Sequence, residues 1–336
     1  MKKRVLSLLL ALMMLLALTA CQKEKEPEKE PTDPNDYHAA LVDRTGKEGM
    51  FSAYYICTWE QMGSDNSSDY VYAGDSTLYI SPDGKTMLVD ASNAASGDEV
   101  MAVLNDLGID TIDYLVCSHP HADHIGGFAD VLSHCTVKQA YMNAHAYETG
   151  TYVNLMAALE TAKVPVTRLW EGDTFQFGDK VTVEIRNPAK DYEFASETDT
   201  LNNASLLMKF TYGQSTFLTA GDLYSPQEKV LAEKLGDWLD ADVCKINHHG
   251  YPTSSCKEWV NAVTAKIAVC ECEGVPSALV QQRYSAAGAV TCYTAMDGTV
   301  AVHTTGDGTY QMQTEHFREQ TNFGTYNGVN GYLEVK

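Results

Sequence analysis

The stretch "CSHPHADHIGG", residues 117–127, contains four potential metal ligands within six positions. They are His119, His121, Asp123 and His124. Histidine nitrogens and carboxylate oxygens are common ligands of zinc, manganese and iron. Because neighbouring side chains in an irregular loop diverge, the spacing favours two ions close together over a single ion. A polar surface loop, or histidines that cap the next helix, is the alternative interpretation, and the density of ligand-type residues disfavours it.

The flanking segments place this loop between a strand and a helix. The preceding "TIDYLVCSH" predicts a short buried strand, and the following "GGFADVLSHC" predicts the start of a helix. Ligands of α/β proteins commonly bind beyond the carboxyl ends of strands. Two later apolar strands also end in ligand-type residues: "FLTAGD" ends in Asp222, and "DVCKINHHG" contains His248 and His249. A carboxylate between two ions can bridge them, which is the role expected of Asp222.

The remaining pattern is one of alternating strands and helices. Hairpins are predicted for residues 76–92, which turn at Pro-Asp-Gly, and for residues 204–223, which turn at Tyr-Gly-Gln. Apolar spacing predicts helices in "GDEVMAVLNDLGI", "YVNLMAALETAKV" and "PQEKVLAEKLGDWL", and "VTVEIRNPA" predicts a strand. Residues 289–310 predict terminal strands joined by Asp-Gly turns. Two series of strands with interspersed helices indicate a layered α/β sandwich with helices on both outer faces.

The N-terminus has the pattern of an export signal. Three basic residues precede an apolar run that ends in Leu-Thr-Ala-Cys, which resembles a bacterial lipobox. This predicts a signal peptide at residues 1–20, a lipidated Cys21, a disordered charged tether at 21–48 and a single domain at 49–336. We therefore expect an exported monomer, held on the extracytoplasmic face of the cell membrane by its lipid alone. An ordinary secretory signal is the alternative.

The charge of the chain limits its partners. The formal net charge is −21, and loss of the three basic signal-peptide residues would make it about −24. An acidic surface disfavours a large nucleic-acid footprint. A small phosphoester remains compatible, because a metal centre supplies local positive charge. Of the eight cysteines besides Cys21, several lie in apolar runs, so we expect mostly free thiols.

Taken together, five motifs resemble those of metallo-β-lactamase-fold hydrolases, in particular the metallo-hydrolase domain of ComEC-type DNA-uptake proteins. They are "GDSTLYISPDGKTMLVDAS", "SHPHADHIGG", "NNASLLMKF", "FLTAGD" and "KINHHGYPTSS", within residues 72–310. The resemblance implies a four-layer αββα sandwich that holds two divalent metal ions. Zinc is expected, with manganese or iron as alternatives.

The resemblance also implies roles for individual residues. His119 and His121 would bind the first ion, Asp123 and His124 the second, and Asp222 both. Either His248 or His249 would complete the second site, and the other would contact the substrate phosphate or donate a proton. Asp90 would support the histidine loop from behind.

Departures from the family pattern concern the first ion and the substrate. Many relatives carry a third histidine between the loop and the bridging aspartate, where this chain has only His134 and His145. An Asn-rich stretch replaces it, which makes Asn202 a candidate site residue. Tyr251 follows His-His-Gly in place of the usual serine. These changes weaken the expectation of DNA as the substrate more than that of metal binding.

The chemistry implied by the resemblance is hydrolysis by a hydroxide held between the two ions, with Asp123, Asp222 and His249 as the catalytic set. The predicted activity is that of a phosphodiesterase or related phosphoester hydrolase acting on a small molecule or a cell-envelope component. One alternative is an acyl hydrolase of lactone, thioester or β-lactam type. Another is a non-catalytic surface binding protein or DNA-uptake accessory.

Overall fold

The computed structural model describes residues 37–58, 74–143, 146–192, 198–274, 276–316 and 332–336. These residues belong to one compact unit, Tyr37–Lys336. The predicted signal peptide, Cys21 and tether residues 21–36 lie outside the described part of the chain. Among the described residues, no helix has both the length and the apolar character that crossing a bilayer requires.

The folded unit begins earlier than the predicted boundary at residue 49. Helix α2 (Tyr37–Val42) lies in the last part of the predicted tether. Leu41 is fully buried, and the His38 ring is 2.9 Å from carboxylate oxygens of both Asp106 and Glu315. The helix therefore packs on the domain, because this segment carries an apolar residue and a histidine that the charged run before it lacks.

Two large sheets form the centre of the unit. The first has the order β18-β17-β16-β1-β2-β3-β5-β7-β8 and the second the order β15-β14-β13-β12-β11-β10-β9. The strands of the first sheet are β1 (Phe51–Tyr55), β2 (Thr77–Ile80), β3 (Thr86–Val89), β5 (Tyr114–Cys117), β7 (Ala140–Asn143), β8 (Val166–Leu169), β16 (Val300–Thr304), β17 (Tyr310–Thr314) and β18 (Tyr332–Val335). Those of the second are β9 (Thr174–Phe177), β10 (Val181–Asn187), β11 (Leu207–Tyr212), β12 (Ser215–Thr219), β13 (Val243–Lys245), β14 (Ile267–Cys270) and β15 (Val290–Tyr293). A separate short pair consists of β4 (Thr111–Ile112) and β6 (Thr136–Val137).

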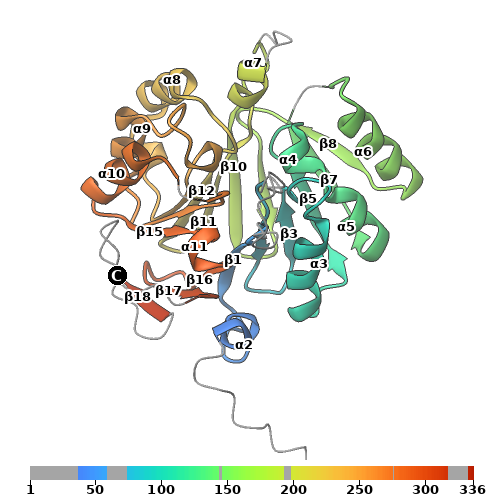
Figure 1. Ribbon diagram of the computed structural model, residues 1–336, viewed down its shortest axis with the longest axis horizontal. Helices are drawn as coiled ribbons and strands as arrows, with labels where there is room; N and C mark the ends of the chain where they lie inside the picture. The colour runs from blue at the N-terminus through green and yellow to red at the C-terminus, as the bar shows by residue number, and fades with distance from the viewer. Residues whose placement is uncertain (1–36, 59–73, 144–145, 193–197, 275, 317–331) are drawn as a thin grey trace, which may run out of the picture. The chain divides into compact units, whose positions relative to one another are not determined.

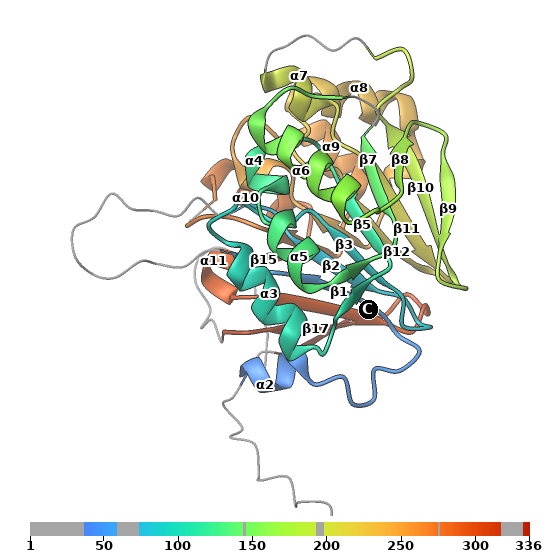
Figure 2. The same cartoon turned by 90° about the vertical axis from the view of Figure 1, so that its right-hand side faces the viewer.

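Helices cover the outer faces of both sheets (Figures 1 and 2). On the first sheet lie α3 (Gly97–Asp106), α4 (Ala122–Ile125), α5 (Phe128–His134) and α6 (Gly150–Thr161). On the second lie α8 (Ser225–Leu235), η1 (Gly236–Leu239), α9 (Lys257–Val263) and α10 (Ala278–Ala286). The remaining helical elements are α7 (Thr198–Asn203), η2 (His248–Gly250) and α11 (Thr294–Asp297).

Three buried apolar clusters separate these four layers. Between the sheets, Phe51 packs edge-on against Phe217 and Tyr79 stacks on Phe210 at 4.4 Å. A second cluster joins the first sheet to α3, α5 and α6, and a third joins the second sheet to α8, α9 and α10. The arrangement is the predicted αββα sandwich.

Parallel strands in both sheets bring the predicted ligand loops together. Strands β3, β5, β7 and β8 run parallel, as do β12, β13, β14 and β15. The histidine loop follows β5, Asp222 follows β12, and His248 and His249 follow β13. Since these loops all leave the carboxyl ends of parallel strands, they meet at one edge of the sandwich.

Most of the predicted elements are confirmed, including both hairpins and the three amphipathic helices. The C-terminal prediction is wrong in one place, because helix α11 interrupts the expected strands at residues 294–297. The Tyr293 amide donates to the Asp297 carboxylate at 2.7 Å, and Gly298 follows at a φ of 66°. This local turn ends β15 in the second sheet and returns the chain to the first sheet as β16.

Candidate metal centre

The histidine loop owes its position to a close backbone approach at its glycines. A Cβ atom on Gly127 would lie 2.1 Å from the Ala91 carbonyl oxygen, so this position requires glycine. The Ala91 amide in turn donates to the His124 carbonyl oxygen at 2.8 Å. These contacts hold the loop after β5 against the loop after β3.

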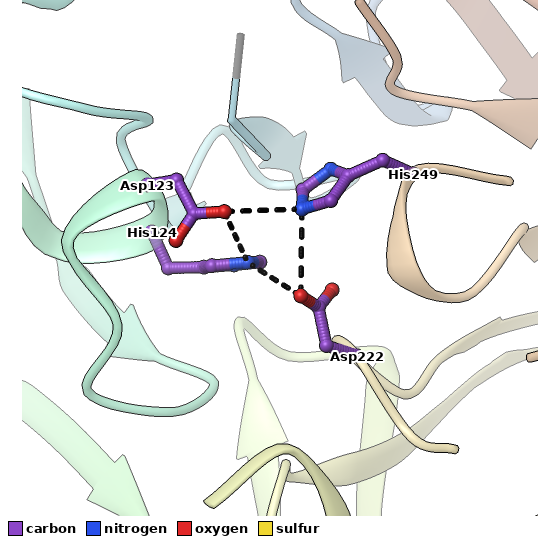
Figure 3. Close-up of side chains that lie close together, drawn as sticks. All are labelled: Asp123, His124, Asp222 and His249. Atoms are coloured by element: carbon purple, nitrogen blue, oxygen red, sulfur yellow. Dashed lines mark hydrogen bonds and ion pairs between the residues drawn. The ribbon is translucent and has the colours of Figure 1, made fainter. Parts of the chain in front are cut away.

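Four of the predicted ligands converge around one point (Figure 3). The His124 Nε2 atom is 3.2 Å from Asp222 Oδ2 and 3.9 Å from Asp123 Oδ2. The His249 Nε2 atom is 3.4 Å from Asp222 Oδ2 and 3.3 Å from Asp123 Oδ2. One donor atom from each residue lies within 4.8 Å of all the others. We call Asp123, His124, Asp222 and His249 the four-residue cluster.

The backbone around the cluster is held in an uncommon conformation. Asp90, Ser92, His248 and His249 have φ values between 49° and 60°, in the left-handed region that non-glycine residues rarely occupy. Each such residue costs on the order of 1–3 kcal/mol and persists only where the surroundings enforce it. Their concentration here indicates that the fold sustains local strain to place these side chains.

Asp90 contacts the histidine loop from behind. Its carboxylate accepts hydrogen bonds from His124 Nδ1 at 2.8 Å, the Ser118 amide at 2.8 Å and the Ser118 hydroxyl at 2.5 Å. With Nδ1 committed to Asp90, the ring presents Nε2 to Asp222. The contact therefore sets both the orientation and the tautomer of His124.

His119 and His121 form a looser pair beside the cluster. Their rings approach each other, His119 Nε2 to His121 Nδ1, at 3.0 Å. His119 Nε2 also lies 3.8 Å from Asp222 Oδ2. Within the part of the chain that the structure describes, neither residue belongs to a group of three or more ligands close enough to surround an ion. The expected ligands of the first ion thus adjoin Asp222 but are not gathered around a common point.

Of the two neighbouring histidines, His249 belongs to the four-residue cluster and His248 does not. The His248 Nε2 atom is 3.9 Å from Asp222 Oδ2, and its Nδ1 pairs with the Thr253 hydroxyl at 2.6 Å. Its ring lies 4.8 Å from that of Tyr224 and 5.1 Å from that of Tyr251. His248 is therefore placed at the rim of the cluster, less buried than His249.

Among the described residues, no hydrogen bond connects Asn202 to the four-residue cluster. It is buried in α7, and its Oδ1 has no hydrogen-bond partner there. Ser205, from the same stretch, makes the contact instead, because its hydroxyl accepts the Asp222 amide at 3.1 Å. His134 is exposed at the end of α5 with its Nδ1 paired to the Asp130 carbonyl oxygen, so it is not the missing third histidine.

Three buried charged residues behind the cluster were not predicted. The Asp75 carboxylate lies 3.0 Å from His249 Nδ1, and Lys245 forms an ion pair with Asp75. The Glu271 carboxylate accepts the Ser76 amide at 3.1 Å. Burial and the nearby Asp75 raise the pKa of Glu271 to about 8. In the sequence, Asp75 directly follows a glycine at the start of the first hairpin, and Lys245 precedes His248 by three residues. These positions were the only sequence features that could have pointed to the two residues.

The electrostatics of the cluster suit a cation. Burial by itself would raise the pKa of the Asp222 carboxyl, but the His124 and His249 rings hold that pKa well below its usual value. Burial alone would lower the pKa of His124, yet the carboxylates around it, Asp222 and Asp123 first, raise it well above 6.5. Asp222 Oδ1 is buried with no hydrogen-bond partner among the described residues. Two carboxylates and two imidazoles around one point fit a divalent transition metal ion.

The fold is a layered α/β sandwich with a cluster of potential metal ligands at one edge, and a comparison with known families gives a matching result. Residues 69–191 match the model of the metallo-beta-lactamase superfamily. This part of the chain is therefore similar to the superfamily that its sequence motifs resemble. The match contains the histidine loop and Asp90, while Asp222 and His249 lie beyond it.

Two bacterial proteins are similar to this chain in sequence. Competence protein ComA of Neisseria gonorrhoeae is 27% identical over 203 residues, which are 57% of this chain and 26% of that protein. ComE operon protein 3 of Bacillus subtilis (strain 168) is 25% identical over 174 residues, 52% of this chain and 22% of that protein. The similarity thus spans only about a quarter of the relatives' own length.

Two solved structures resemble this chain at low sequence identity. The E377D mutant of the CmlA β-hydroxylase has a TM-score of 0.50 and 14% identity, covering 76% of this chain and 54% of that one. The metallo-beta-lactamase fold protein YhfI from Bacillus subtilis has a TM-score of 0.47 and 12% identity, covering 72% and 95%.

Proposed function

We propose that this protein is a metal-dependent hydrolase, and more narrowly a phosphodiesterase or related phosphoester hydrolase with two divalent metal ions. The observation that carries this proposal is the four-residue cluster, which gathers two carboxylates and two imidazoles at the carboxyl ends of parallel strands. The match of residues 69–191 to the model of the metallo-beta-lactamase superfamily supports it. Zinc is the first choice of metal, with manganese or iron as alternatives.

The residues divide between two adjacent sites. Asp123, His124, Asp222 and His249 would hold one ion, and His119 and His121 would hold the other together with Asp222. Asp222 suits the shared position, because its Oδ2 lies within 4 Å of a ring nitrogen of His119, His124, His248 and His249.

When bound, divalent ions of this kind activate a water molecule and offset the negative charge that develops on phosphoryl oxygens. The protein's part is to fix ligand geometry and to exclude bulk water. His119, His124, Asp222 and His249 are nearly inaccessible to solvent, so charge–charge interactions among them are strong. His248 is less buried than His249, so its ring could contact the substrate phosphate or protonate the leaving oxygen, and the Thr253 hydroxyl contacts its Nδ1.

Phosphoesters are favoured over acyl substrates by the resemblance to the competence-type metallo-hydrolase branch and by the identity of the residues around the first ion. The only described histidine between the loop and Asp222, His134, lies away from the cluster. The substrate we propose is a small molecule or a cell-envelope phosphoester. The setting is the extracytoplasmic face of the membrane, where Cys21 would anchor a monomer.

The test is hydrolysis of bis(p-nitrophenyl) phosphate by the purified full chain loaded with Zn²⁺ or Mn²⁺. Asp222→Asn serves as the inactive variant, and Asp179→Asn, in the exposed turn between β9 and β10, as the matched control. Metal-dependent cleavage by the wild type and by the Asp179 variant, but not by the Asp222 variant, is expected. Opening of a lactone with no cleavage of the diester would replace the proposal with an acyl hydrolase. Cleavage of neither would favour a binding protein.

A further inference from the structure

Asp75 and Lys245 form a buried ion pair directly behind His249. Asp75 is 2% exposed and Lys245 is 3% exposed, and the Lys245 ammonium contacts Asp75 Oδ2. Asp75 lies just before β2 in the first sheet and Lys245 ends β13 in the second. The pair therefore links the two sheets at the edge that carries the cluster.

The other oxygen of Asp75 reaches the ring of His249. Asp75 Oδ1 lies 3.0 Å from His249 Nδ1, and the Glu271 carbonyl oxygen lies 3.2 Å from the same nitrogen. When the neutral ring donates its Nδ1 proton to these acceptors, its Nε2 carries the free lone pair that a metal ion needs. That Nε2 is the atom that faces Asp123 and Asp222.

Lys245 extends the same arrangement to Asp222. Its ammonium also donates to the Gly221 carbonyl oxygen at 3.2 Å and to the Ile246 carbonyl oxygen at 3.3 Å. Gly221 adopts a φ of 51°, and a Cβ atom there would lie 2.8 Å from the Ser205 hydroxyl. One side chain thus contacts both the turn that carries Asp222 and the carboxylate that orients His249.

A stability role does not readily account for this pair. Removing two charges from water costs several kcal/mol per ion, and replacing a buried ion pair by apolar residues is often neutral or stabilising. By contrast, carboxylates that bind the second nitrogen of a ligand histidine commonly raise metal affinity 10–100-fold. Both Asp75 and Lys245 make the contacts that such a role requires.

We propose that Asp75 and Lys245 are positioning residues of the metal centre. Asp75 fixes the ring orientation and tautomer of His249. Lys245 holds Asp75 in place and sets the distance between His249 and Asp222 through the Gly221 carbonyl. This inference deepens the proposed function and rests on its metal centre, but not on the identity of the substrate.

The test measures Zn²⁺ affinity of the full chain by competition with a chromophoric chelator, without turnover. The variants are Asp75→Asn, Lys245→Met and the double variant that carries both changes. Lys266→Met is the matched control, because Lys266 pairs with Asp242 at 2.9 Å at the opposite ends of β13 and β14. Thermal melting of the metal-free proteins is recorded alongside.

We expect Asp75→Asn to weaken Zn²⁺ binding about 10–100-fold. The double variant should melt within a few degrees of the wild type yet bind Zn²⁺ as weakly as Asp75→Asn. Lys245→Met alone leaves the Asp75 carboxylate buried without its partner, and that variant can fail to fold. The double variant has no buried charge at either position, so it still tests the inference in that case. The control should bind Zn²⁺ as the wild type does.

Wild-type Zn²⁺ affinity in Asp75→Asn or in the double variant would overturn the inference and leave a purely structural pair. Weakened binding in these variants, together with a wild type that cleaves no phosphodiester, would support the positioning role while contradicting the proposed function. A wild type that binds no Zn²⁺ would contradict both.

Discussion

The four-residue cluster and the pair formed by His119 and His121 are the two halves of the proposed metal centre. They differ in how firmly neighbouring side chains hold the potential ligands in place. In the four-residue cluster, both histidines have a buried carboxylate behind the ring: Asp90 behind His124 and Asp75 behind His249. Within the described segments, no carboxylate makes a hydrogen bond to the His119 or His121 ring. The Ser118 hydroxyl contacts His119 Nδ1, and the two rings face each other. Preorganised ligands lose less freedom on binding, so the cluster should bind its ion more tightly than the pair.

In the proposed centre with two ions, Asp222 would serve both halves and the other ligands only one. We therefore expect stepwise loading, in which the cluster takes up its ion before the pair of His119 and His121 does.

Replacing Asp222 by Asn should have the largest effect, since it removes the carboxylate common to both halves. Phosphodiester cleavage should fall by at least about 100–1,000-fold, as on loss of a major stabilising group in an active site. Elemental analysis should show that the amount of bound metal falls at both sites together. Loss of one ion with the other fully retained would show that Asp222 serves only one half.

Comparing His249→Ala with His121→Ala tests the order of loading directly. His249→Ala should abolish the tighter of two Zn²⁺ binding events, because it removes a ligand of the cluster. His121→Ala should leave that event unchanged and remove only the weaker one. Calorimetric titration of each variant separates the two events, and equal effects of the two substitutions would refute the distinction between the halves.

Asp90→Asn should weaken the cluster without removing a ligand. The amide cannot accept from His124 Nδ1, the Ser118 amide and the Ser118 hydroxyl as well as the carboxylate does. Leaving a buried donor unsatisfied costs about 1–3 kcal/mol, and loss of such support lowers metal affinity about 10–100-fold. Denaturant unfolding of the metal-free protein and chelator competition measure the two effects. Unchanged affinity would show that Ser118 and the backbone suffice to orient His124.

Gly127→Ala should have the smallest effect and act on both halves equally. The added methyl group would meet the Ala91 carbonyl oxygen, so the histidine loop must shift, at a cost of about 1–3 kcal/mol in the free energy of unfolding. Thermal melting checks the cost. Gly150→Ala, where a Cβ atom would meet nothing within 4 Å, is the control that should leave stability nearly unchanged.

Sequence patterns predicted the parts of this centre that are local. The spacing from His119 to His124 is fixed within one loop, and apolar strands followed by Asp222 and His249 are visible as contiguous motifs. The hairpins followed from turn residues between β-type runs. All of these depend on neighbours in the chain, which is why the sequence shows them.

The contacts across the molecule were not predictable in this way. Asp75 and His249 are 174 positions apart, and their meeting depends on how the two sheets face each other. The choice of His249 over His248 depends on two consecutive residues with positive φ, which no spacing reveals. Asn202 was selected by its place in a motif, but the fold brings the Ser205 hydroxyl to the Asp222 amide instead.

The most direct test of the metal centre is an anomalous difference map at the zinc absorption edge from crystals of the Zn²⁺-loaded protein. We predict the strongest peak between Asp123 Oδ2, His124 Nε2, Asp222 Oδ2 and His249 Nε2, with a weaker peak beside His119 and His121. A peak at the histidine pair alone, or no peak among these four side chains, would contradict the assignment of the cluster as the primary metal site.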